Sequence, residues 1–110
     1  MRKVSSEEEL RKKLDKEIVD RYVGIKGLKP LRRGNFVGAE EDKFYVSLSE
    51  EEVYELSPLA YYIWALCDGE RTVEDVAHNI SENANVEYYR VIEPLVLVLD
   101  EMKRAGLVEF

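Results

Sequence analysis

The fold is decided by one stretch of the sequence, residues 57–73, which reads SPLAYYIWALCDGERTV. Ser57 followed by Pro58 indicates a helix start, because serine caps free backbone N–H groups and proline suits the first helical position. Gly69 follows the end of this helix, because glycine readily takes the left-handed conformation found there. Thr72 is a typical cap for the next helix. The stretch therefore predicts two consecutive helices joined by a short turn.

The chain after this stretch continues as helix. The second helix ends in the polar segment 83–85, and a third helical pattern runs from about Glu87 to Ala105, where Gly106 closes it. Pro94 interrupts this last pattern, and since proline removes a backbone donor, we expect a helix that is kinked or restarted there. Three helices are thus predicted downstream of residue 56.

The segment before residue 57 has a period of two, which is typical of strands. Apolar Phe44, Val46 and Leu48 alternate with other residues, and an acidic turn at 40–42 connects them to a strand that begins at Asn35. A third, shorter strand after a second acidic turn comprises Val53, Tyr54, Glu55 and Leu56. Three antiparallel strands that follow one another leave an edge strand with unpaired backbone groups.

The N-terminal region predicts one amphipathic helix near residues 6–22, because Leu10, Leu14, Ile18 and Tyr22 recur at steps of four. Its apolar stripe is narrow, so the helix needs to dock on another surface. Glycines and a proline then indicate a loop. We expect residues 1–27 to form this helix and a linker, and residues 28–110 to form the domain proper.

Charge is distributed unevenly along the chain. Residues 1–33 hold 11 Lys and Arg against 6 Asp and Glu, whereas residues 34–110 hold 5 against 17. An acidic domain repels phosphate backbones, so nucleic acid is a disfavoured partner. No membrane span and no signal peptide are recognisable, which favours a cytoplasmic protein. The abundance of Glu, Lys and Arg and the absence of glutamine are typical of heat-adapted proteins, so we expect a thermophilic source.

The residues that carry chemistry in enzymes are sparse or isolated. The single cysteine, Cys67, is flanked by apolar residues and is expected in the core, and the single histidine, His78, is expected in solvent. No histidine or cysteine stands at metal-ligand spacing, and no phosphate-binding glycine motif occurs. The sequence therefore predicts a binding protein and no enzyme, with no metal and no cofactor.

The last helix carries more apolar surface than a small domain needs. Its apolar residues cover a much wider face around the helix axis than the stripe of about 100° that a surface helix normally shows. We expect part of this face to contact something other than the domain core. Three occupants remain open: the N-terminal helix, a second copy of the chain in a homodimer, or a ligand.

Three segments together resemble the PqqD family: residues 56–58, residues 64–73 with the run Cys-Asp-Gly-Glu-Arg-Thr-Val, and residues 101–108 with Gly106-Leu107. The resemblance covers roughly residues 28–110. It implies an α+β fold, a winged helix-turn-helix in which a three-stranded antiparallel sheet precedes three helices. The N-terminal helix is an addition to this pattern.

The resemblance also implies a function. Such domains are precursor-peptide recognition elements, which hold the leader segment of a ribosomally synthesised peptide and present it to a modifying enzyme, often a radical SAM enzyme. The leader would add as an antiparallel strand beside the third strand, in a cleft shared with the third helix. The residues that would form this site are Val53, Tyr54, Glu55 and Leu56 as backbone edge, Val91, Leu95, Val98 and Met102 as apolar wall, and Arg90 as an anchor for an acidic leader residue.

Two other functions remain open from the sequence. The first is a winged-helix transcription regulator, although the second helix carries Glu74, Asp75 and Glu82 and no Lys or Arg, which is unusual for a helix that reads a DNA groove. The second is an interaction subunit whose apolar helix docks on a partner without binding any peptide.

Overall fold

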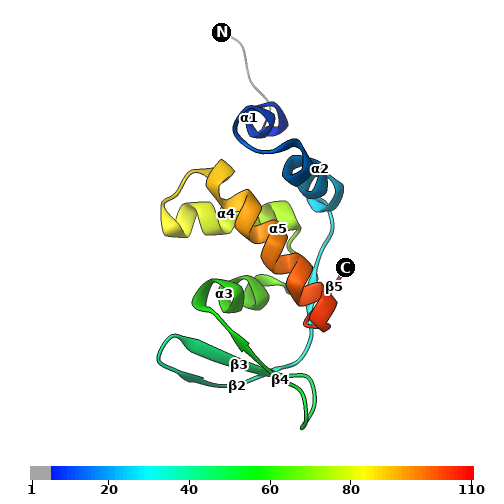
Figure 1. Cartoon of the computed structure of the whole chain (residues 1–110), viewed down its shortest axis with the longest axis vertical. Coiled ribbons are helices and arrows are strands. Elements are labelled where there is room, and N and C mark those ends of the chain that lie inside the picture. Colours follow the sequence, from blue (N-terminus) through cyan, green and yellow to red (C-terminus); the bar gives the residue numbers. More distant parts are fainter. Residues whose placement is uncertain (1–5) are drawn as a thin grey trace.

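The computed structural model describes residues 6–110, in which one three-stranded sheet lies at one end of the molecule and the helices lie above it (Figure 1). The elements, in chain order, are α1 (Ser6–Lys13), α2 (Lys16–Ile25), β1 (Leu31–Arg32), β2 (Asn35–Glu40), β3 (Lys43–Ser47), β4 (Val53–Leu56), α3 (Pro58–Leu66), α4 (Val73–Ala84), α5 (Tyr88–Ala105) and β5 (Val108–Glu109). The prediction of a mixed α+β chain with three strands before three helices is confirmed.

The three-stranded sheet has the order β2-β3-β4 with antiparallel pairing. The alternation along β3 places Phe44 and Val46 on the face that meets α3, where Phe44 stacks on Tyr61 with ring centroids 4.4 Å apart. Trp64 continues this aromatic contact and donates its indole N–H to the Arg33 carbonyl at 3.0 Å. These contacts hold the sheet against α3, and thereby set the position of β4.

The helix ends follow the predicted capping residues. The Ser57 hydroxyl accepts the Ala60 N–H at 3.2 Å, and Thr72 forms a reciprocal capping box with Asp75. The last helix ends at Gly106, whose φ of 82° lies in the left-handed region that glycine favours. The short, local signals of the sequence therefore predict these boundaries correctly.

The prediction of one N-terminal helix over residues 6–22 is wrong, because the structure has two. Asp15 takes an extended conformation with ψ of 141°, and its carbonyl accepts the Val19 N–H at 3.1 Å, which begins α2. The break lets both helices pack on α5, with Leu10 from α1 and Val19 from α2 buried in the common core. Apolar residues at steps of four do not reveal such a break, since the spacing continues across it.

Pro94 neither ends nor restarts the last helix, which runs as a single element from Tyr88 to Ala105. Proline at this place removes the hydrogen bond that an N–H would donate to the Arg90 carbonyl, and its ring crowds that carbonyl. Burial on either side explains why the helix continues, because Val91, Ile92 and Leu95 are all buried there. Packing of α5 against the core thus outweighs the local cost of the proline.

A second, two-stranded sheet was not predicted. Leu31 of β1 pairs with Glu109 of β5, and Arg32 pairs with Val108. Strands of two residues carry no periodic signal, so the sequence offers no means to find them. The pairing fastens the segment after α2 to the C-terminal end of the chain.

The core is centred on α5 and includes the cysteine. Ile92 and Leu99 are fully buried, and Cys67 is buried with its thiol donating to the Ile63 carbonyl at 3.2 Å. Burial raises the pKa of the Cys67 thiol to about 12, so this group is protonated and unreactive at neutral pH. The expectation of a core cysteine is confirmed, and His78 is exposed as expected, with its ring stacked on Tyr88.

The hydroxyl groups of Tyr22 and Tyr88 share a hydrogen bond that joins α2 to α5. Burial raises the pKa of Tyr22, with the hydrogen bond to Tyr88 as the second cause. The protonated phenol is therefore favoured in the folded state. Its contribution to stability is fully present below the ordinary tyrosine pKa of about 10 and is lost as the pH rises above it.

We expect Tyr22→Phe to lower the free energy of unfolding by about 1 kcal/mol at neutral pH, because Tyr88 loses its partner. The variant should also lose less stability than the wild type between pH 8 and pH 11, since the buried phenol is gone. Urea unfolding across this range measures both effects. Equal pH dependence of the two proteins would contradict the role given to Tyr22.

Candidate functional site

The main sheet has two edge strands, β2 and β4, and among the described residues each of them pairs with β3 only. Of these two edges, β4 is the one that lies beside α5. Leu48 donates its N–H to the Glu52 carbonyl at 2.8 Å. Since hydrogen-bonded pairs alternate along an antiparallel ladder, Tyr54 and Leu56 direct their backbone groups to β3. Val53 and Glu55 therefore direct their N–H and C=O groups outward, where another strand can pair with them.

A groove of about 360 Å³ lies beside this edge, between β4 and α5. Its floor is apolar, because Leu56, Met102 and Leu107 are buried there, and Val98 is half-buried on its wall. The lining residues are Tyr54, Glu55, Leu56 and Ser57 after and along β4, Ala60 of α3, Val98, Glu101, Met102 and Ala105 of α5, and Leu107. A backbone edge and an apolar groove thus stand side by side.

The charge of this groove is negative. Its lining includes two acidic residues, Glu55 and Glu101, and no Lys or Arg. Tyr54 at the same edge donates its hydroxyl to the Glu52 carboxylate at 3.3 Å, which adds a third carboxylate nearby. A ligand seated here meets carboxylates at the rim and an apolar floor.

A second hollow of about 210 Å³ lies next to the groove, nearer the N-terminal end of α5. Its lining is apolar except for one residue, Arg90, whose guanidinium lies 5.6 Å from the centre of the Tyr89 ring. The lining residues are Leu59 and Ile63 of α3, Ile80 and Ala84 of α4, Val86, and Arg90, Val91, Pro94 and Leu95 of α5. We call the first site the β4 groove and this one the α3–α5 hollow.

The residues predicted from the sequence fall into these two places. Tyr54, Glu55, Leu56, Val98 and Met102 line the β4 groove, whereas Arg90, Val91 and Leu95 line the α3–α5 hollow. Val53 stands exposed at the start of β4 and lines neither. Val91 and Leu95 are themselves buried, so they serve chiefly as core.

Five residues that line the β4 groove were not predicted: Ser57, Ala60, Glu101, Ala105 and Leu107. Glu101 and Ala105 share the face of α5 that carries Val98 and Met102, at steps of three and four, so helical spacing could have indicated them. Ser57 directly follows Leu56 at the end of β4, so its place in the chain could have indicated it. Ala60 enters through the tertiary packing of α3, for which the sequence holds no signal.

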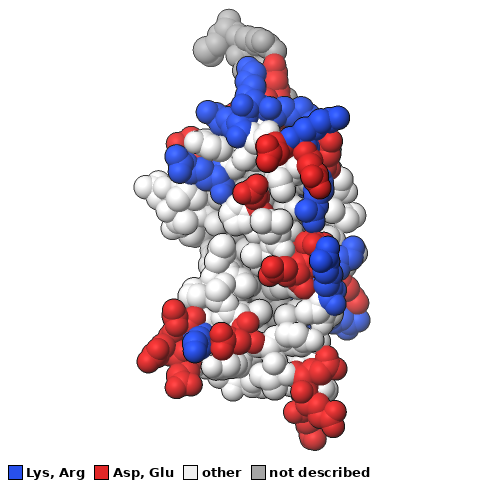
Figure 2. Space-filling view, in the orientation of Figure 1, with Lys and Arg blue, Asp and Glu red and all other residues white. Residues whose placement is uncertain are grey.

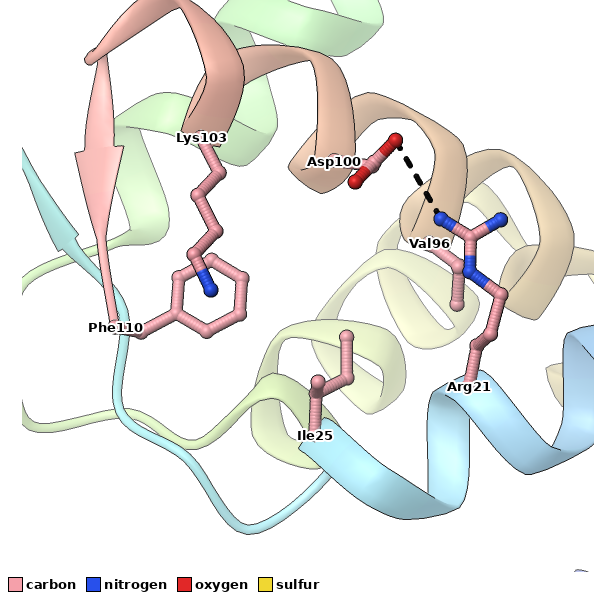
Figure 3. Close-up of a pocket in the computed structure, with 6 residues that line it drawn as sticks. All are labelled: Arg21, Ile25, Val96, Asp100, Lys103 and Phe110. Atoms are coloured by element: carbon pink, nitrogen blue, oxygen red, sulfur yellow. Dashed lines mark ion pairs between the residues drawn. The ribbon is translucent and has the colours of Figure 1, made fainter.

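The N-terminal helices pack on the opposite side of α5 and contribute no residue to the β4 groove. Figure 3 shows Arg21 and Ile25 of α2 facing Val96 and Asp100 of α5 across a small pocket, with Arg21 paired to Asp100 at 3.5 Å. Phe110 and Lys103 close this pocket of about 210 Å³. One of the three expected occupants of the apolar helix is thus found on a different face, and it leaves the groove open.

Neither metal-binding clusters nor membrane spans are found in the part of the chain that the structure describes. No group of three or more His, Cys, Asp or Glu side chains is arranged there to hold a metal ion. Among residues 6–110, no helix combines the length and the apolarity needed to cross a bilayer.

Comparison with known proteins identifies a family. No curated protein and no solved structure matches the chain. The family model for coenzyme PQQ synthesis protein D (PqqD) matches residues 45–108, which span most of β3, all of β4 and the three helices that follow, and therefore both walls of the β4 groove. The first 44 residues, with α1 and α2, lie outside the match. Since the matched segment covers more than half of the chain, this protein belongs to the PqqD family.

Proposed function

We propose that this protein binds the leader segment of a ribosomally synthesised precursor peptide and presents it to a modifying enzyme of the radical SAM type. PqqD-family proteins are non-catalytic accessory proteins that take part in the biosynthesis of PQQ and of other ribosomally made, modified peptides. The proposal adds to this the ligand and its place: the leader pairs with β4 as an added antiparallel strand.

The observation that carries the proposal is the free edge of β4 beside an apolar groove. Main-chain hydrogen bonds to Val53 and Glu55 give affinity for any extended peptide. Alternate side chains of that peptide then enter the groove between Val98 and Met102, which gives specificity. An edge without a groove binds strands indiscriminately, and a groove without an edge does not fix their register.

We also propose the finer fold, a winged helix-turn-helix built by residues 28–110, with α1 and α2 as an addition. The DNA-binding alternative gains no support from α4, the second helix of the three. It carries Glu74, Asp75 and Glu82 and no Lys or Arg, whereas helices that read a groove need donors for bases and cations for phosphates.

Titration calorimetry of the full chain with synthetic leader peptides, taken from short reading frames beside its gene, tests the proposal. We expect one of them to bind with one-to-one stoichiometry and a negative heat-capacity change, since apolar surface is buried. If none binds in the presence of the neighbouring modifying enzyme, while the protein is folded, the proposal is wrong.

We expect Val98→Ala to weaken leader binding about fivefold without unfolding the protein, because it removes about 1 kcal/mol of apolar contact from a half-buried wall. Val37→Ala is the matched control, since Val37 is exposed on β2 and lines neither site. Calorimetry and thermal unfolding of both variants measure the two effects. An unchanged dissociation constant for Val98→Ala would place the ligand elsewhere.

A further inference from the structure

We infer that charge fixes the direction of the bound leader. An acidic residue of the leader lies at Arg90, and a basic residue about five positions closer to the C-terminus of the leader lies at Glu101. The inference rests on the proposed function, because it assumes a peptide strand paired with β4. It adds the α3–α5 hollow as a second subsite and states which residue types each subsite takes.

The two subsites are continuous along one face of α5. Val91, Leu95, Val98 and Met102 follow one another at steps of three and four, and the first two line the hollow while the last two line the groove. Arg90 and Glu101 are eleven positions apart on the same helix, which corresponds to about 16 Å. An extended peptide covers this length with about five residues.

The direction follows from how β4 and α5 lie. Gly106, which follows the last residue of α5, lies next to Leu48, because a Cβ added at Gly106 would be 3.7 Å from the Leu48 side chain. Leu48 donates its N–H to the carbonyl of Glu52, the residue before β4 begins. The C-terminal end of α5 therefore lies near the start of β4. The other end of β4 leads into α3, whose Leu59 lines the hollow. The strand and the helix therefore run in opposite senses, as Figure 1 shows.

A peptide antiparallel to β4 consequently runs in the same sense as α5. Its N-terminal part lies over the α3–α5 hollow and its C-terminal part lies in the β4 groove. Side chains that reach the hollow thus precede those that reach the groove.

The charges of the two subsites are opposite. The lining of the β4 groove has acidic residues and no cation, whereas the lining of the α3–α5 hollow has one cation, Arg90, and no acidic residue. Within residues 6–110, Arg90 has no carboxylate at ion-pair distance, unlike Arg71, which pairs with Asp68, and Arg104, which pairs with Asp100.

This guanidinium is the one Lys or Arg that lines either subsite. Figure 2 shows a similar asymmetry on a larger scale, since Lys and Arg predominate over α1 and α2 and Asp and Glu predominate over the sheet. Between these two ends the left side of the view is largely uncharged, whereas the right side carries both signs of charge. A carboxylate on the ligand therefore has its favourable place at Arg90, and a cation has its place in the β4 groove.

Selection of a phage-displayed library of random 12-residue peptides on the immobilised full-length chain tests the inference. We expect enriched peptides to carry Asp or Glu beside a bulky apolar residue, followed about five positions later by Lys or Arg. Arg90→Glu should weaken binding of these peptides about fivefold, and the double variant Arg90→Glu with Glu101→Lys should select the reversed charge order. Arg104→Glu is the matched control, because Arg104 is an exposed arginine on the same helix outside both subsites. We expect this variant to leave the affinity for the selected peptides unchanged.

The outcomes separate the inference from the proposed function. Enriched peptides without this charge order, or with an affinity that Arg90→Glu leaves unchanged, overturn the inference and leave strand binding at β4 intact. No enrichment of any peptide by the folded protein counts against peptide binding itself, and so against both. Because Arg90 and Glu101 are exposed, thermal unfolding of the variants should match the wild type.

Discussion

Leu95→Glu is expected to unfold the protein, and not to give a folded variant that merely fails to bind peptide. The Leu95 side chain has no exposed surface, and the residues around the α3–α5 hollow that it lines are apolar except for Arg90. A buried charge without a partner costs about 3–5 kcal/mol, and the loss of the leucine adds to this. The total is comparable with the whole stability of a small domain, about 5–15 kcal/mol.

Circular dichroism and urea unfolding of Leu95→Glu measure this effect at neutral pH. Leu97→Glu is the matched control, because Leu97 lies on the same helix, two positions later, with 44% of its surface exposed. We expect this control to fold with stability near that of the wild type. A Leu95→Glu protein with the native spectrum and the native urea midpoint would show that Leu95 belongs to an open cleft and not to the core.

Leu95 and Leu97 differ in burial, and this difference depends on tertiary packing and not on the local sequence. Both are leucines in the same apolar run, and helical spacing shows only that the run is too wide for one partner. Burial divides them: α2 covers Val96, α3 and α4 cover Leu95, and Leu97 remains exposed. Which neighbour covers which residue is decided by tertiary packing. Helical spacing therefore predicted the excess of apolar residues on this helix, but not the element that covers each of them.

The elements themselves were largely predictable, for local reasons. Ser57, Thr72 and Gly106 mark helix ends through interactions within one turn, and the period of two along β3 needs no distant partner. The failures concern the break at Asp15 and the pairing of β1 with β5, where the determinant is a contact with a distant part of the chain.

The candidate site was predicted in outline by the resemblance, which joined the third strand to the last helix. Val98 and Met102 do lie opposite Tyr54 and Leu56 across the β4 groove. The separate α3–α5 hollow was not foreseen. Leu95 lies about two turns and Arg90 about three turns before Met102 on α5, and this distance along the helix places them beside α3 and α4 instead of β4.

Glu55→Pro is expected to weaken leader binding at least tenfold while the protein stays folded. The Glu55 N–H points away from β3, so a proline there breaks no bond of the sheet, and edge strands tolerate it in that position. The same substitution removes a donor that the added strand needs, and the proline ring hinders its approach. The lost hydrogen bond alone accounts for about 1 kcal/mol, and the obstruction adds to it.

Two matched variants isolate the backbone effect. Glu55→Ala removes the carboxylate and keeps the N–H, so we expect it to bind the leader far better than Glu55→Pro does. Tyr54→Pro acts one residue earlier, where the N–H bonds to β3, and should destabilise the sheet itself. Calorimetry with the leader peptide and urea unfolding together give the pattern: Glu55→Pro loses binding and keeps stability, whereas Tyr54→Pro loses stability. Full binding by Glu55→Pro would contradict the pairing of the peptide with β4, since an antiparallel strand centred on this edge takes a hydrogen bond from the Glu55 N–H.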